Sequence, residues 1–185
     1  MAGYYINPLD DLAGGIQDFL RHRQEVPVTT EYTSLAVSTP TQERPSWDAT
    51  WLRVAGIMAA RSTCPRKHVG AVLVSPENRV LSTGYNGAPA GEPHCTDVGC
   101  LTDSEGHCIR ALHAEMNAIL GCTNESRGGI IYVTHFPCLA CVLVLVQAGI
   151  QRLVCPPAPN KERYNAARRI LDHQDVVITT MEVDI

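Results

Sequence analysis

His113-Ala114-Glu115 and Pro137-Cys138-Leu139-Ala140-Cys141 are the two stretches that decide the fold and the chemistry of this 185-residue chain. They supply one imidazole and two thiols, which are donors that zinc prefers, together with one carboxyl group. Three protein ligands leave the fourth position of a tetrahedral zinc open, as in catalytic rather than structural sites. Zinc lowers the pKa of a water bound there to roughly 7, and Glu115 stands close enough to move its protons.

A Cys-x-x-Cys pair by itself is more often a structural zinc knuckle or a redox pair. Here His113 begins one apolar-periodic run and Cys138 begins another directly after a proline, so both ligand sets are predicted to lie at helix N-termini. Such ends carry positive partial charge and unpaired N–H groups, which favour thiolates. His-x-Glu followed by Pro-Cys-x-x-Cys also matches the zinc-deaminase signature, so the sequence predicts a catalytic zinc on His113, Cys138 and Cys141.

The chain resembles the zinc-dependent deoxycytidylate (dCMP) deaminase family, including the related late-competence deaminases, over about residues 51–154. Besides the zinc motifs, the stretches that carry the resemblance are Val69–Val72, Gly84–Pro89, Tyr132–Thr134 and Gln147–Ile150. The zinc motif marks the cytidine deaminase-like superfamily, whereas Gly-Tyr-Asn-Gly-x-Pro and Gln-Ala-Gly-Ile narrow it to this branch. The tail departs from the family pattern, because prolines stand where many members have an aromatic residue near the nucleotide, and the next tyrosine is Tyr164.

Composition restricts the classes of function. A net charge of -4 and a pI near 5.9 give no general attraction to a polyanion, so a nucleotide is an easier substrate than a long nucleic acid. No apolar run is long enough to span a bilayer, and the start of the chain lacks the pattern of a signal peptide, so we expect no membrane partner and a cytoplasmic location. The eight cysteines are therefore expected to bind metal or to remain thiols.

The predicted organisation is an N-terminal extension or arm over residues 1–45 and a zinc-dependent deaminase domain over residues 46–185. The first segment is rich in Thr, Ser and Pro toward its end and has few large apolar residues there. Periodicity then predicts helices over 46–60, 113–120, 138–148 and 162–173, and strands over 69–75, 79–85, 130–134, 152–155 and 176–181. As in the superfamily, we expect an α/β fold of three layers, α/β/α, with a five-stranded mixed sheet.

The segment from Gly91 to Arg110 is too irregular for a regular element and unusually rich in potential zinc ligands. Some members of the resembled family carry a second, structural zinc on cysteines that match Cys64 and Cys95. This implies a closed site here, for which the favoured set is Cys64, Cys95, His107 and Cys108. His94 and Cys100 are rival ligands, and reduced thiols that are merely packed together are the alternative.

The resemblance implies hydrolytic deamination of the cytosine ring of a deoxynucleotide, dCMP to dUMP plus ammonia, which feeds thymidylate synthesis. A zinc-activated water would attack C4 while Glu115 carries protons. The backbone N–H of Ala114 is expected to bind the base carbonyl, Phe136 to wall the C5 side, and Asn86 to contact the sugar. For Asn86, a role as an Asn-Gly turn residue competes.

Related dCMP deaminases form oligomers, often hexamers, and many are activated by dCTP and inhibited by dTTP near the segment that matches Gly84–Gly87. The resemblance therefore implies a homo-oligomer and these effectors. Alternative functions are deamination of dCTP or of a 5-substituted dCMP, or a non-catalytic zinc-stabilised accessory of competence or nucleic-acid uptake. A tRNA adenosine deaminase fits the acidic pI and the cysteines poorly. The intact Glu115 favours an enzyme over an accessory module.

Overall fold

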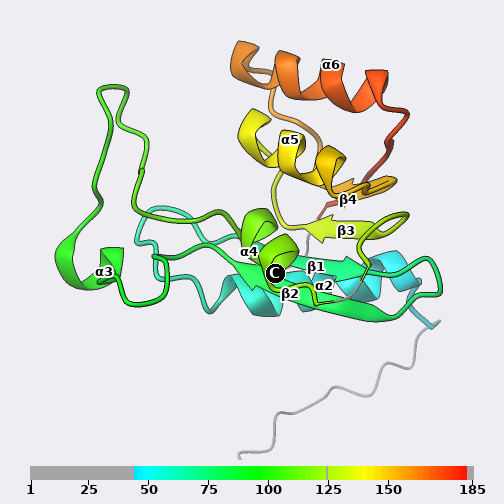
Figure 1. Ribbon diagram of the computed structural model, residues 1–185, viewed down its shortest axis with the longest axis horizontal. Coiled ribbons are helices and arrows are strands. Elements are labelled where there is room, and N and C mark those ends of the chain that lie inside the picture. The colour runs from blue at the N-terminus through cyan, green and yellow to red at the C-terminus, as the bar shows by residue number, and fades with distance from the viewer. Residues whose placement is uncertain (1–43, 124, 183–185) are drawn as a thin grey trace, which may run out of the picture. The chain divides into compact units, whose positions relative to one another are not determined.

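The computed structural model describes residues 44–123 and 125–182, so the predicted extension over 1–45 lies almost entirely outside the described residues. Five strands form one sheet in the order β2-β1-β3-β4-β5 (Figure 1). β1 pairs antiparallel with β2 and β3, whereas β3, β4 and β5 are parallel. The strands are β1 (Gly70–Val74), β2 (Val80–Tyr85), β3 (Ile130–Val133), β4 (Arg152–Cys155) and β5 (Val177–Thr180). The predicted five-stranded mixed sheet is confirmed.

Helices cover both faces of this sheet, as the three-layer prediction requires. α2 (Trp47–Ala59) packs Leu52 and Ala55 against alternate residues of β1, β3 and β4. The other face is covered by α4 (Ala114–Leu120), α5 (Leu139–Gln147) and α6 (Asn165–His173), which share the larger core cluster. The parallel strand pairs follow from two of these helices, because α5 connects β3 to β4 and α6 connects β4 to β5.

Local sequence explains where these elements begin and end. Ser46 caps α2 as predicted, since its Oγ accepts the backbone N–H of Ala49 at 3.2 Å. α5 is followed by Gly149, whose φ of 77° suits a residue without a side chain. The last predicted helix, residues 162–173, is divided: a 3-10 turn, η1 (Glu162–Tyr164), precedes α6. Among the described helices, none has the length and apolarity needed to cross a membrane.

α4 lies unusually close to β2, and Gly84 makes this approach possible. A Cβ atom at Gly84 would overlap with the carbonyl oxygen of Ala114 and would lie 2.6 Å from the backbone N of Ala118. Both neighbours are backbone atoms of α4 and cannot rotate away. The helix that carries the first zinc motif therefore rests directly on the strand backbone, which gives a physical reason for the glycine in Gly84-Tyr85-Asn86.

A polar network ties α2 to three strands at one edge of the smaller core. Arg152 of β4 donates to both carboxylate oxygens of Asp48 and to the Thr179 hydroxyl of β5, and Tyr132 of β3 donates its hydroxyl to Asp48 at 2.9 Å. Burial and this hydrogen bond raise the pKa of Tyr132. These hydrogen bonds pair polar groups that are half-buried. They therefore hold α2 to the three strands by polar contacts as well as by apolar packing.

Candidate functional site

The predicted metal ligands stand at the starts of two helices that cover the same face of the sheet. His113 is the N-cap of α4 and Cys138 is the N-cap of α5, both with extended backbone angles. Neither side chain makes a capping hydrogen bond. Each is therefore placed by a helix start and remains free to bind a ligand, in the positive field of the helix N-terminus.

Cys141 lies one turn into α5 and completes the group. The Nδ1 atom of His113 lies 3.2 Å from the Sγ of Cys141 and 3.5 Å from the Sγ of Cys138, and all three donor atoms lie within 4.8 Å of one another. Tetrahedral zinc, with bonds of about 2.0–2.3 Å, places its donors about 3.3–3.8 Å apart. The donor set and its spacing therefore fit zinc, and three ligands leave one position for water or substrate.

The protonation of these thiols is set by their contact. A hydrogen bond with Cys141 lowers the pKa of Cys138 to about 3, with a further contribution from His113. The same contact and burial raise the pKa of Cys141, and the Cys138 hydrogen bond raises that of His113. Without a metal, the three side chains share protons through hydrogen bonds with one another. A metal cation that binds them displaces these protons.

Glu115 is the second residue of α4 and lines the same pocket as His113 and Cys138. Its side chain is almost completely buried, with 4 % exposure, and this burial raises the pKa of its carboxyl group. A raised pKa makes this carboxylate a stronger proton acceptor, which suits general acid/base catalysis. Burial, with a smaller effect of the Glu115 charge, raises the pKa of the Cys155 thiol to about 12.

The pocket around these groups has a volume of about 540 Å³. All three predicted substrate contacts lie in its wall: Asn86, Ala114 and Phe136. Phe136 meets the edge of the Tyr164 ring at 5.8 Å between centroids, so the two aromatic residues form one wall. Their contacts with a substrate stay predictions.

Asn86 is mainly occupied with the protein's own backbone. Its Oδ1 accepts the N–H of Val69 at 2.8 Å, and its Nδ2 donates to the carbonyl of Lys67 at 2.8 Å. The side chain is buried, with 7 % exposure, and therefore fixes the loop that precedes β1. One donor hydrogen and one lone pair remain for a ligand in the pocket.

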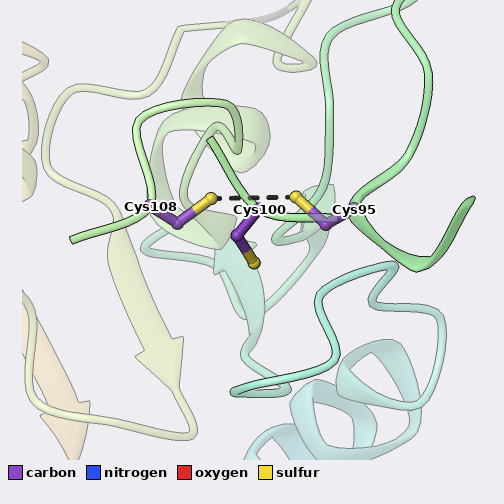
Figure 2. A group of neighbouring side chains, drawn as sticks. All are labelled: Cys95, Cys100 and Cys108. Atoms are coloured by element: carbon purple, nitrogen blue, oxygen red, sulfur yellow. Dashed lines mark hydrogen bonds between the residues drawn. The ribbon is translucent and has the colours of Figure 1, made fainter. Parts of the chain in front are cut away.

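Of the second predicted ligand group, Cys95 and Cys108 lie close together, and Cys100 joins them in place of His107 (Figure 2). The Sγ atoms of Cys95, Cys100 and Cys108 lie within 4.8 Å of one another, and those of Cys95 and Cys108 lie 3.7 Å apart. Cys100, a rival ligand in the prediction, thus takes part. The favoured His107 does not, because its Nδ1 faces the carboxylates of Asp103 and Glu105, at 3.4 and 3.5 Å, on an exposed part of the loop.

Cys64 is buried and lies near this thiol cluster. The backbone N–H of Thr96 donates to the carbonyl of Thr63 at 3.2 Å, so the segment before Cys64 is joined to α3 (Cys95–Val98). Burial raises the pKa of Cys100, the hydrogen bond with Cys95 opposes this rise, and Cys108 and then the charge on Cys64 add to it. Cys64 and Cys108 also line the pocket, which places the thiol cluster beside the Glu115 site.

Sequence reasoning missed several pocket residues, among them Lys67, His135, Arg163 and Tyr164. Tyr164 was noted only as the next tyrosine after the prolines, although it is buried against Phe136. His135 could have been found from its position three residues before Cys138. Lys67 carried no signal beyond its place between Cys64 and the first strand.

Comparisons with known proteins agree with this geometry. The family model of the cytidine and deoxycytidylate deaminase zinc-binding region matches residues 45–156. ComE operon protein 2 of Bacillus subtilis is 40% identical over 145 residues, which are 77% of this chain and 75% of that protein. The deoxycytidylate deaminase of Mycobacterium phage D29 is 42% identical over 125 residues, which are 61% of this chain and 96% of that protein.

Among solved structures, dCMP deaminase from the cyanophage S-TIM5, crystallised in complex with dCMP and dUMP, superposes with a TM-score of 0.62 at 25% identity. The match covers 76% of this chain and 100% of that chain.

Proposed function

The chain belongs to the cytidine and deoxycytidylate deaminase zinc-binding family, and from this premise we propose that it hydrolyses dCMP to dUMP and ammonia. One observation carries the proposal: three zinc-type donors lie within 4.8 Å of one another, and two of them, His113 and Cys138, line a pocket large enough for a nucleotide together with the buried Glu115. Relatives named deoxycytidylate deaminase, and the dCMP and dUMP complex of the phage enzyme, support this substrate. The reaction would supply thymidylate synthesis.

Catalytic zinc is held by His113, Cys138 and Cys141 in this proposal. Bound there, zinc supplies a Lewis acid that makes water nucleophilic at neutral pH. The residues of the chain do the rest. Glu115 accepts one proton of the attacking water and passes it to N3 of the ring, and later transfers the remaining proton of the oxygen added at C4 to the amine, which leaves as ammonia. Its burial keeps this proton relay apart from bulk water.

Other parts of the pocket orient the base. The first N–H groups of a helix have no acceptor within the helix, so the Ala114 N–H at the start of α4 is available to the base carbonyl. Phe136, held by the edge contact with Tyr164, walls the C5 side. Asn86 can contribute its remaining donor to the sugar while its other bonds hold the loop.

The test uses purified zinc-loaded protein, incubated separately with dCMP, dCTP, CMP and deoxycytidine. We expect the largest kcat/KM with dCMP, measured as the loss of cytosine absorbance together with released ammonia. A higher kcat/KM with dCTP or with a 5-methylated dCMP would identify the alternative substrate instead. A zinc-loaded protein that releases ammonia from none of these compounds would support the non-catalytic accessory module. The buried Glu115 beside the metal donors argues against that alternative.

A second zinc is proposed at the thiol cluster, with Cys64, Cys95, Cys100 and Cys108 as ligands. Three clustered thiols and a buried fourth on an adjoining segment form a closed all-cysteine set, which suits structural zinc. The loop that carries three of them, residues 91–112, has few regular elements, so a metal would supply the order that an apolar core does not.

Metal stoichiometry tests this ligand set. Elemental analysis should give two zincs per chain in the wild type and one in a Cys100→Ser variant, because a tetrahedral site that loses a ligand loses affinity. His107→Ala should keep both zincs, since its imidazole faces Asp103 and Glu105. Loss of a zinc from the His107 variant, with retention by the Cys100 variant, would restore the set that was favoured from the sequence.

Assembly and location complete the proposal. We expect a homo-oligomer, with a hexamer as the family precedent, and exposed leucines on α4 and α5 support an association surface: Leu120 is 73 % exposed and Leu143 is 51 % exposed. Control by dCTP and dTTP follows from the resemblance alone. Metal-binding thiolates and a nucleotide substrate support a cytoplasmic location, where thiols stay reduced.

A further inference from the structure

The wall of the active-site pocket is positively charged although the chain as a whole is acidic. Arg66, Lys67 and Arg163 line it, whereas Glu115 is the one carboxylate among the described lining residues. The chain has a net charge of -4, so this local excess of cations is not a property of the general surface. A cationic wall in a pocket favours an anionic ligand, because low-dielectric surroundings strengthen its field.

The three cations differ in what already binds them. Arg66 donates to the carbonyl of Gly106 at 2.7 Å, and Arg163 donates to the Tyr164 hydroxyl at 3.0 Å and stacks over its ring. Within residues 44–123 and 125–182, the Lys67 ammonium has neither an ion pair nor a hydrogen-bond partner. Lys67 therefore has its full hydrogen-bonding capacity available for a ligand.

Lys67 also lies where two hollows meet. A smaller side hollow of about 290 Å³, lined by Pro156, Pro157 and Glu182, shares Lys67 and His135 with the active-site pocket. Lys67 lines both hollows, and the active-site pocket also contains His113 and Cys138, so this lysine lies between the metal-binding end and the side hollow. A ligand group that extends from the zinc end toward the side hollow passes this lysine.

His135 adds a neutral donor next to this cation. Its Nδ1 lies 3.3 Å from the Thr134 hydroxyl, which itself accepts the N–H of Gly70 at 3.1 Å. Burial, with a smaller effect of Lys67, lowers the pKa of His135 to about 4, so the ring is neutral at pH 7. In the tautomer that carries the ring proton on Nε2, the Thr134 hydroxyl donates to Nδ1 and the ring can donate into the pocket.

The backbone of Lys67 is fixed before any ligand arrives. Its carbonyl accepts from Asn86 Nδ2, and the N–H of Val69 donates to the same amide side chain. An exposed side chain on a fixed backbone loses less conformational freedom on binding than one on a free loop. Asn86 thus acts here as a positioning residue for Lys67.

We propose that Lys67 and His135 bind the 5′-phosphate of the nucleotide and so make this site select a nucleoside monophosphate over the nucleoside. The inference rests on the proposed deamination of dCMP at the same pocket. An ammonium and a neutral N–H donor match the oxygens of a phosphate dianion, and the free Lys67 supplies the charge-assisted bond. Deoxycytidine, which lacks the phosphate, would leave both groups without their partner.

The test compares Lys67→Met with Lys161→Met, since the chain has two lysines and Lys161 is exposed and lines neither hollow. Both changes remove one positive charge. For Lys67→Met we expect kcat/KM with dCMP to fall about 10- to 100-fold, mainly through KM, because one charge-assisted hydrogen bond is lost. Turnover of deoxycytidine should stay within about twofold of wild type, and Lys161→Met should change neither substrate.

Binding and rescue measurements make the result decisive. Affinity for dUMP, measured calorimetrically on zinc-loaded protein, should fall by a similar factor in Lys67→Met, whereas affinity for deoxyuridine should not change. Lys67→Arg keeps the charge and should recover most of the preference for dCMP. His135→Ala should lower the ratio of dCMP to deoxycytidine turnover about 3- to 10-fold through one lost neutral bond.

Two results for Lys67→Met would overturn the inference: an equal loss on dCMP and deoxycytidine, or no loss on either. A selective loss on dCMP in Arg163→Met, with none in Lys67→Met, would assign the phosphate to the wrong cation and would also overturn it. Failure of the proposed function looks different, because wild-type protein would then deaminate no cytosine compound at all.

Discussion

A Glu115→Gln variant is expected to keep its fold and its zinc but to lose at least about 10²- to 10⁴-fold in the turnover of dCMP. The change preserves the shape of the side chain and deletes the group that accepts and returns protons. The loss should reach at least the usual value for one acid/base group, because three proton movements depend on this carboxyl group. Single-turnover kinetics with saturating dCMP measure it directly.

The stability of this variant separates a catalytic from a structural role. Burial raises the pKa of Glu115, so the ionised carboxylate destabilises the metal-free fold. This cost develops as the pH rises through the unfolded-state pKa of about 4.3 and is complete above the raised pKa of the folded state. Glutamine escapes the cost, so at pH 7 the metal-free variant should be at least as stable as the wild type in urea unfolding.

Glu77→Gln is the matched control for this experiment, because Glu77 lies exposed in the β1–β2 turn and outside the pocket. It should leave turnover, zinc content and stability unchanged. A folded, zinc-loaded Glu115→Gln protein that turns over dCMP within about tenfold of wild type would contradict the mechanism. The fold and the metal ligands would survive that result.

A Gly84→Ala variant is expected to lose about 3 kcal/mol or more of unfolding free energy, and with it the order of the zinc site. The added methyl would overlap with the Ala114 carbonyl and press on the Ala118 backbone, so α4 must move away from β2. Because His113 and Glu115 travel with α4, zinc affinity and turnover should fall together. Denaturant unfolding and elemental analysis on the same sample measure both effects.

Thr83→Ala provides the control on the same strand. Thr83 is exposed, and its side chain points away from the face of β2 on which Gly84 meets α4. It should change the unfolding free energy by no more than about 0.5 kcal/mol. A Gly84→Ala protein with wild-type stability and full zinc content would show that α4 can retreat without disturbing its first turn, which would contradict the packing argument.

Much of the fold could be predicted from the sequence because its signals are local. The run after Ser46 has helical spacing with a serine cap, and residues 130–133 are rich in β-branched side chains, so each element is specified within its own segment. The long irregular segment before α4 was also recognised. The division of residues 162–173 into η1 and α6 was missed, because a single turn of different pitch leaves the apolar spacing almost intact.

The site was predicted as far as motifs reach. His113, Glu115, Cys138 and Cys141 belong to short spacings that fix which face of a helix start they occupy. The thiol cluster depends on how an irregular loop folds back, and no periodicity records whether Cys100 or His107 turns toward Cys95. Lys67 and Tyr164 line the same two hollows only through tertiary structure, since Lys67 precedes the first strand and Tyr164 follows the fourth.

The placement of His113 and Cys138 as helix caps separates the groups proposed for the chemistry from those proposed for substrate recognition. The atoms that would do the chemistry hang from two helix starts packed on one sheet, whereas the groups that would recognise the rest of the substrate, Lys67 and His135, stand on connecting segments. Connections accept insertions and exchanges that a packed helix does not. A protein engineer could therefore graft new connections at these two places and change the compound that is accepted, while the reaction carried out on it stays the same.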